Sequence, residues 1–109
     1  MRKFRLEDMT RGWFIGNFEP AVLRSEAAEV AVQKYGAGDY EARHHHKVAT
    51  EVTLIVSGEV EMNNVRYSAG DIVVIEPGEA TDFRALSDAV TVAVKLPSVK
   101  NDKYVQEVA

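Results

Sequence analysis

The chain has 109 residues, a length that fits one domain and is too short for two ordinary ones. Hydrophobic residues make up 46% of it and charged residues 28%, the balance of a folded globular protein rather than a disordered one. The net charge is −4 and the Lys and Arg residues are scattered, which argues against a nucleic-acid partner. No apolar run approaches the roughly 20 residues that span a bilayer, so we expect no membrane partner either.

The sequence contains no cysteine, which excludes a disulfide scaffold and a Cys-ligated zinc site. A metal ion would therefore have to be held by nitrogen and oxygen ligands. The first fourteen residues include basic side chains, but no apolar stretch follows them, so they do not resemble a signal peptide. We therefore expect a cytoplasmic protein.

From residue 29 onward the chain alternates between short apolar or β-branched segments and turn residues. We predict strands over residues 29–35, 40–47, 51–56, 59–62, 65–67, 71–75, 81–86 and 90–96. Asn63 and Asn64 predict a two-residue hairpin turn, because asparagine tolerates positive φ. Short strands at this regular spacing predict an all-β sandwich or barrel.

A short pattern occurs twice, as YGAGD at 35–39 and as YSAGD at 67–71, each time leading into a strand. Two similar tight turns explain it, with Gly for the backbone angle and Asp to satisfy backbone N–H groups. The repeat also suits a barrel built from two similar halves. We divide the chain into an N-terminal segment (1–28) that packs on the barrel or on a dimer partner, the barrel (29–97) and a polar C-terminal tail (98–109).

The three histidines of the chain are consecutive: His44, His45 and His46. Successive side chains of a strand point to opposite faces, so His44 and His46 share one face with Tyr40, and His45 lies on the other. Glu51 begins the next strand. Two imidazoles and a carboxylate on adjacent strands suit a divalent metal ion such as Fe, Mn, Zn or Ni. The same pattern is also compatible with a solvated histidine patch that holds no metal.

The spacing around these residues is specific. It resembles the first motif of the cupin superfamily, which here runs through Gly38, His44, His46, Glu51 and Gly58 with 5, 1, 4 and 6 intervening residues. Residues 70–78 (GDIVVIEPG) are similar to the second motif of that superfamily. The resemblance covers about residues 30–96. It implies a small double-stranded β-helix, or jelly-roll, barrel with a metal ion inside near one mouth.

The sequence departs from the family pattern at one position. The second motif of the family continues with a third ligating histidine, and Thr81 stands there in this chain. Threonine is a poor metal ligand, so the implied ligand set is His44, His46 and Glu51. Such a site either keeps open positions for a substrate to chelate, or has decayed and is kept for its shape. Asp82 should point to the opposite face, so we do not nominate it as a substitute.

Three further residues should line the same interior as the ligands: Thr53, Thr81 and Phe83. The two hydroxyl groups can orient water or substrate beside a metal ion. Ordinary barrel filling is the better interpretation of Phe83. Tyr40 is the one inward group that can serve as a general acid, and we nominate it as the candidate catalytic residue.

Three classes of function are compatible with these residues. The resemblance implies, by analogy, a small metal-dependent enzyme of the dioxygenase, isomerase or decarboxylase type acting on a small polar or organic-acid substrate. The alternatives are a non-catalytic sugar- or metabolite-binding module and a protein-assembly barrel. We favour the enzyme. The aromatic segment at residues 13–18, with the outward-facing Val52, Leu54 and Val56, predicts a homodimer.

Overall fold

The computed structural model describes residues 1–105, and the last four residues of the predicted tail, 106–109, lie outside the described part. The elements are a 3₁₀ turn, η1 (Leu6–Asp8), and the strands β1 (Trp13–Gly16), β2 (Leu23–Arg24), β3 (Glu29–Tyr35), β4 (Tyr40–His45), β5 (Thr50–Ser57), β6 (Glu59–Met62), β7 (Val65–Ser68), β8 (Ile72–Ile75), β9 (Thr81–Ala85), β10 (Ala89–Leu96) and β11 (Tyr104–Val105). Within residues 1–105 no helix is long and apolar enough to cross a membrane.

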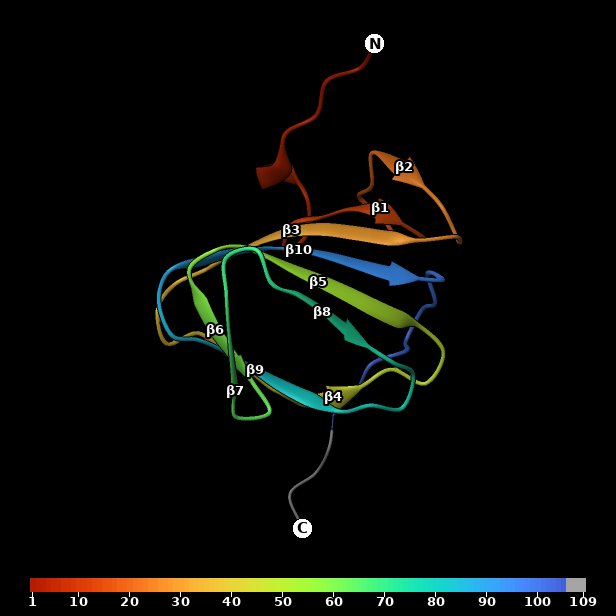
Figure 1. Cartoon of the computed structure of the whole chain (residues 1–109). Helices are drawn as coiled ribbons and strands as arrows, with labels where there is room; N and C mark the ends of the chain where they lie inside the picture. The colour runs from red at the N-terminus through yellow and green to blue at the C-terminus, as the bar shows by residue number, and fades with distance from the viewer. Residues whose placement is uncertain (106–109) are drawn as a thin grey trace.

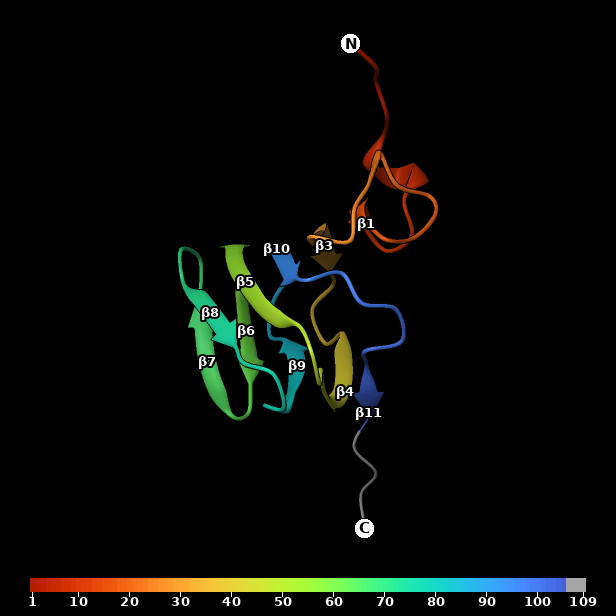
Figure 2. The ribbon, with the colours of Figure 1, turned by 90° about the vertical axis from the view of Figure 1, so that its right-hand side faces the viewer.

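The strands form two sheets that face each other (Figures 1 and 2). One sheet has the order β2-β1-β3-β10-β5-β8, and the other has the order β11-β4-β9-β6-β7. The pairings are antiparallel except that between β1 and β2. Strands distant in sequence, such as β3 and β10, lie side by side, as in a jelly roll. The predicted all-β barrel is confirmed.

Local sequence explains the turns between these strands. Asn63 and Asn64 have φ of 51° and 63° and form the predicted hairpin turn between β6 and β7. The two copies of the repeated pattern form matching turns. Asp39 Oδ2 accepts a hydrogen bond from the N–H of Gly36, and Asp71 Oδ2 accepts one from the N–H of Ser68, each at 2.8 Å. The turn chemistry expected from the sequence therefore accounts for the repeat.

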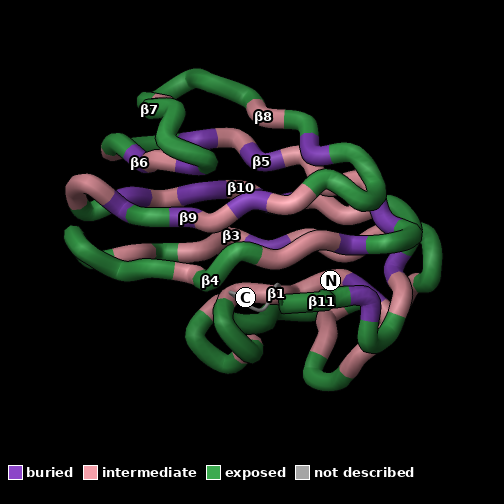
Figure 3. The backbone as a smooth tube through the Cα atoms, turned by 90° about the horizontal axis from the view of Figure 1, so that it is seen from below, coloured by how far each residue is buried: buried purple, intermediate pink, exposed green. Residues whose placement is uncertain are grey.

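The hydrophobic core lies between the two sheets. Its buried residues are Ile55, Val60, Met62, Ile75, Phe83, Ala85 and Ala89. They come from β5, β6, β8, β9 and β10, whose buried stretches run through the middle of the molecule in Figure 3. The antiparallel register places Thr50 and Glu51 of β5 beside Leu96 and Lys95 of β10. Polar and charged side chains at this end of the strands border the core residue Ile75, which pairs with Glu51, and they line the candidate site.

Strand β10 turns its smaller side chains inward. Thr91 and Ala93 are buried, whereas Val90, Val92 and Val94 on the other face are only half-buried. A simple hydrophobic criterion would place the valines inside. The small inward residues leave space between the sheets, and the valines give the outer face of the sheet an aliphatic surface.

Candidate metal centre and its cavity

A β-bulge in β4 sets which of its side chains face the interior. Glu41 pairs with Phe83 and His44 with Thr81, so three steps along β4 match two steps along β9. The extra residue reverses the alternation on the N-terminal side of the bulge. As a result Glu41 faces the cavity, and Tyr40 does not.

The expected inward position of Tyr40 is therefore wrong. Its side chain is 52% exposed, and the Arg84 guanidinium lies 4.8 Å from the centre of its ring. Tyr40 is absent from the cavity lining, and the role of general acid, which depended on an inward position, no longer has that support.

His44 and His46 lie after the bulge and both line the cavity. Their ring centres are 5.3 Å apart and their planes are nearly perpendicular. The Nδ1 atom of His44 lies 2.9 Å from the carbonyl oxygen of Ala42. Because a carbonyl can only accept, Nδ1 carries the proton in this contact, and Nε2 of neutral His44 keeps its lone pair. His44 thus has the tautomer that metal-binding histidines adopt when a carbonyl orients them.

His46 is 5% exposed, and its Nε2 atom is buried with no hydrogen-bond partner among the described residues. Burial, with the nearby charges of Lys95 and His44, lowers the pKa of His46 to about 4, so the ring is neutral at pH 7. A buried ring nitrogen without a partner is costly, and a bound cation would satisfy it. Nδ1 of His45 is also buried and has no hydrogen-bond partner within residues 1–105, but that ring stacks on Tyr104, 5.3 Å away, outside the cavity lining.

Glu51 lines the same cavity from the start of β5. Burial raises the pKa of its carboxyl above the ordinary value, and the Lys95 ammonium and the Thr53 hydroxyl act in the opposite direction. Thr53 donates its hydroxyl hydrogen to Oε2 of Glu51 over 3.2 Å. This contact holds the carboxylate in one orientation.

The threonine that stands in place of a third histidine is buried, lies opposite His44 in the register and lines the cavity. The Thr81 hydroxyl donates to the carbonyl oxygen of Asp82 at 2.7 Å, so its hydrogen is not directed at the imidazoles. Asp82 in turn accepts a hydrogen bond from the N–H of Asn63 at 2.8 Å. Phe83, also in the lining, packs against Tyr35 with 4.5 Å between ring centres.

The number of side chains placed to hold a metal ion is small. Within residues 1–105 no three His, Cys, Asp or Glu side chains are spaced to hold a metal ion together. The pair formed by His44 and His46 fits a divalent cation by its two available imidazole groups. Glu51 is the third candidate donor by its position in the cavity, while its carboxylate is bonded to Thr53.

Several interior polar residues were not predicted from the sequence. The Tyr35 hydroxyl lies 2.8 Å from Oε1 of Gln33 and 3.2 Å from Oε1 of Glu41. Burial and the Glu41 carboxylate raise the pKa of Tyr35 above its ordinary value, so it stays a hydrogen-bond donor. Alternation along residues 29–35 already puts Gln33 and Tyr35 on one face. The inward position of Glu41 could not be predicted in this way, because it depends on the β-bulge in β4 and the hydrophobic pattern of the sequence does not reveal a bulge.

The cavity between the sheets is narrow, with a volume of about 80 Å³. Beside it lies a wider groove of about 810 Å³ between the N-terminal segment and the loop before β11. The residues that line both spaces are Arg11, Trp13, His46, Lys95 and Lys103. We call these five residues the mouth, because they stand between the groove and His44.

No protein-family model and no curated protein matches the chain. Solved structures do match it in fold. An uncharacterised conserved protein with a double-stranded β-helix domain from Klebsiella pneumoniae subsp. pneumoniae MGH 78578 superimposes with a TM-score of 0.72 and 22% identity, over 98% of this chain and 93% of that one. An RmlC-like cupin from Shewanella frigidimarina NCIMB 400 gives 0.64 and 18%, over 70% and 71%. The DMSP lyase DddQ from Ruegeria pomeroyi DSS-3 gives 0.71 and 21%, over 86% and 49%.

These similarities show the fold. The chain has the double-stranded β-helix architecture of the cupin superfamily, as the spacing of its first motif predicts. In this chain the interior holds a pair of imidazoles, His44 and His46, with the buried Thr81 paired to His44 in the register.

Proposed function

We propose that this cupin binds a divalent metal ion, of the Fe, Mn, Zn or Ni type, through His44 and His46 with Glu51. We further propose that it is a metal-dependent enzyme acting on a small polar or organic-acid molecule. The observation that carries the proposal is the pair of imidazoles in one cavity. One is oriented by the Ala42 carbonyl, and the other has a buried Nε2 with no partner among the described residues.

A divalent ion at this place would polarise an oxygen atom of a bound substrate or water. The remaining tasks fall to residues of the chain. Thr53 donates a hydrogen bond to the Glu51 carboxylate and so fixes its orientation in the cavity that it shares with the imidazole pair. Phe83, Met62 and Ile75 form the apolar wall that keeps bulk water from the inner end of the cavity.

A non-catalytic binding module is the second candidate function. Two observations favour it. Tyr40 faces away from the cavity, and Thr81 directs its hydroxyl to a backbone carbonyl instead of toward the imidazoles. A cavity of this kind can recognise a metabolite with or without a metal ion and without proton transfer.

Elemental analysis of untagged protein, purified without added metal or chelator, tests the proposal. We expect near-stoichiometric divalent metal in the parent protein and none in a His44→Ala/His46→Ala variant. His45→Ala is the matched control, because that ring stacks on Tyr104 outside the cavity, and it should keep its metal. Folded parent protein that contains no metal and takes none up on titration would contradict the metal-dependent enzyme and leave the binding module.

A further inference from the structure

The mouth brings together cationic side chains from distant parts of the chain. Arg11 precedes β1, Lys95 lies near the end of β10, and Lys103 precedes β11. The Lys95 ammonium lies 4.8 Å from the centre of the Trp13 ring and 4.0 Å from Oε1 of Glu29, and its side chain is 17% exposed. These contacts hold a positive charge at the entrance to the cavity.

The acidic side chains of the groove are already engaged. Glu19 forms an ion pair with Arg24 at 2.9 Å, and Glu29 accepts a hydrogen bond from the Ser98 hydroxyl at 2.8 Å as well as facing Lys95. Asp102 accepts hydrogen bonds from the backbone N–H groups of residues 47–49.

The cationic side chains of the groove differ from the acidic ones in their pairing. Arg11, Lys100 and Lys103 line the groove and form no ion pair with any residue of the described range 1–105. The groove is therefore locally positive in a chain whose net charge is −4. Such a local excess of one sign in a concave, partly desolvated surface concentrates small ions of the opposite charge.

A second feature points to a ligand at the same place. His46 lines both the cavity and the groove, is 5% exposed, and presents a buried Nε2 atom without a partner among the described residues. A buried polar atom without a protein partner is satisfied by a water molecule or by a ligand that reaches it. A molecule that extends from the groove into the cavity passes both the cations and this ring.

We propose that the mouth is a binding site for the oxyanion group, carboxylate or phosphate, of a small molecule. Arg11 and Lys103 contact the anion directly, Lys95 adds its charge from beside Trp13, and the rest of the molecule points toward His44 and His46. The inference deepens the proposed function, since it concerns the ligand of the same cavity. Unlike the proposed metal centre, this anion site needs no metal ion, because its positive charges belong to side chains.

Trp13 is the only tryptophan of the chain and lies in the mouth, so its fluorescence reports on this site directly. The experiment is a titration of protein stripped of metal, with the chelator dialysed away, using malonate, inorganic phosphate and the uncharged analogue malonamide. We expect a saturable change in Trp13 emission with malonate or phosphate and none with malonamide. A response to only one of the two anions identifies the preferred oxyanion.

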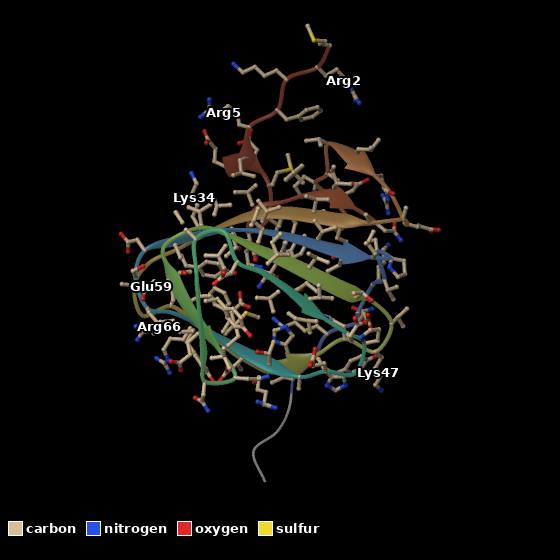
Figure 4. All side chains as sticks on the ribbon, viewed as in Figure 1. Arg2, Arg5, Lys34, Lys47, Glu59 and Arg66 are labelled. Carbon is tan, nitrogen blue, oxygen red and sulfur yellow. The ribbon has the colours of Figure 1, made fainter. Side chains whose placement is uncertain are left out.

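The variants Arg11→Gln and Lys103→Ala should each weaken the binding by about tenfold, as expected when a hydrogen bond to a charged group is lost. Lys34→Ala is the matched control. It removes the same charge from an exposed residue at the other end of β3 from Glu29 (Figure 4), outside the mouth, and should leave the affinity unchanged.

Three results would overturn the inference: no saturable response to either anion, an equal response to malonamide, or equal weakening by Lys34→Ala. The outcome is separate from that of the metal analysis. Anion binding by a protein that never takes up metal would support this inference and contradict the metal-dependent enzyme.

Discussion

Asp102 shows how a single side chain can position the histidine segment. Its carboxylate is buried and accepts hydrogen bonds of 2.9 to 3.2 Å from the backbone N–H groups of Lys47, Val48 and Ala49. These residues directly follow His46. Asp102 therefore joins the loop before β11 to the end of β4, and it fixes the place where His46 leaves the strand.

We predict that Asp102→Ala lowers the free energy of unfolding by about 2–3 kcal/mol, because three backbone N–H groups lose a charged acceptor. Asp102→Asn, which keeps one acceptor oxygen, should cost less. Urea unfolding at pH 7 measures both. Asp8→Ala is the control, since Asp8 is exposed on η1 and accepts no side-chain hydrogen bond within residues 1–105, and it should change stability little.

The same contacts make the stabilisation depend on pH. Burial acts to raise the pKa of Asp102, but the hydrogen bonds from Ala49, Lys47 and Val48 outweigh it and hold the pKa below the ordinary value of 3.8. The folded state thus prefers the ionised group, so its contribution is present above pH 3.8 and disappears as the pH falls through the lowered pKa. The difference in the free energy of unfolding between the parent protein and Asp102→Asn should become smaller below that pH. A difference that stays constant on acidification would contradict this account.

At the scale of strands, the alternation of residue types is enough to predict most of the fold. The segments at 29–35 and 59–62 coincide with β3 and β6, and Asn63–Asn64 form the predicted turn. These signals are local, because a β-branched run, a turn residue and a two-residue period each have one favoured backbone geometry. For these elements, the way the strands pair in the fold agrees with what the local sequence predicts.

The candidate site could be predicted only in part, and β4 explains why. His44 and His46 follow the bulge and keep the alternation that leads into the cavity, whereas Tyr40 precedes it and is turned outward. A bulge depends on how two strands pair, and neither strand records it alone. In β10 the hydrophobic pattern alone would place the valines inside. The valines instead lie on the outer face of the sheet, so the alternation of the strand places Lys95 in the interior beside Glu51.

At the scale of the whole molecule, the outer face of the larger sheet is aliphatic from strand to strand. One cross-strand row runs from β8 to β3 through Val74, Val52, Val94 and Val30, and the next runs through Ile72, Leu54, Val92 and Val32. Ile72 is 63% exposed and Val74 is 52% exposed. Adjacent rows of this kind, without a charged residue between them, are costly to leave in water.

We propose that a second copy of the chain covers this face, because two such faces are self-complementary about a two-fold axis. The parent protein should have twice the chain mass of 12.1 kDa in sedimentation equilibrium. Ile72→Glu/Val74→Glu should give folded monomer. Val65→Glu places a glutamate on an exposed valine of the other sheet and should leave the dimer intact. A parent protein that sediments as a monomer would refute this assembly.

The proposed metal centre consists of one divalent ion held by Nε2 of His44 and Nε2 of His46. The most direct test is the side-chain ¹⁵N spectrum of the three histidines during titration of metal-free protein with zinc, since metal binding shifts the nitrogen that coordinates. We predict that the Nε2 signals of His44 and His46 move together and saturate at one equivalent, while the signals of His45 stay in place. Unchanged spectra, or a shift at His45 alone, would contradict a metal centre in this cavity.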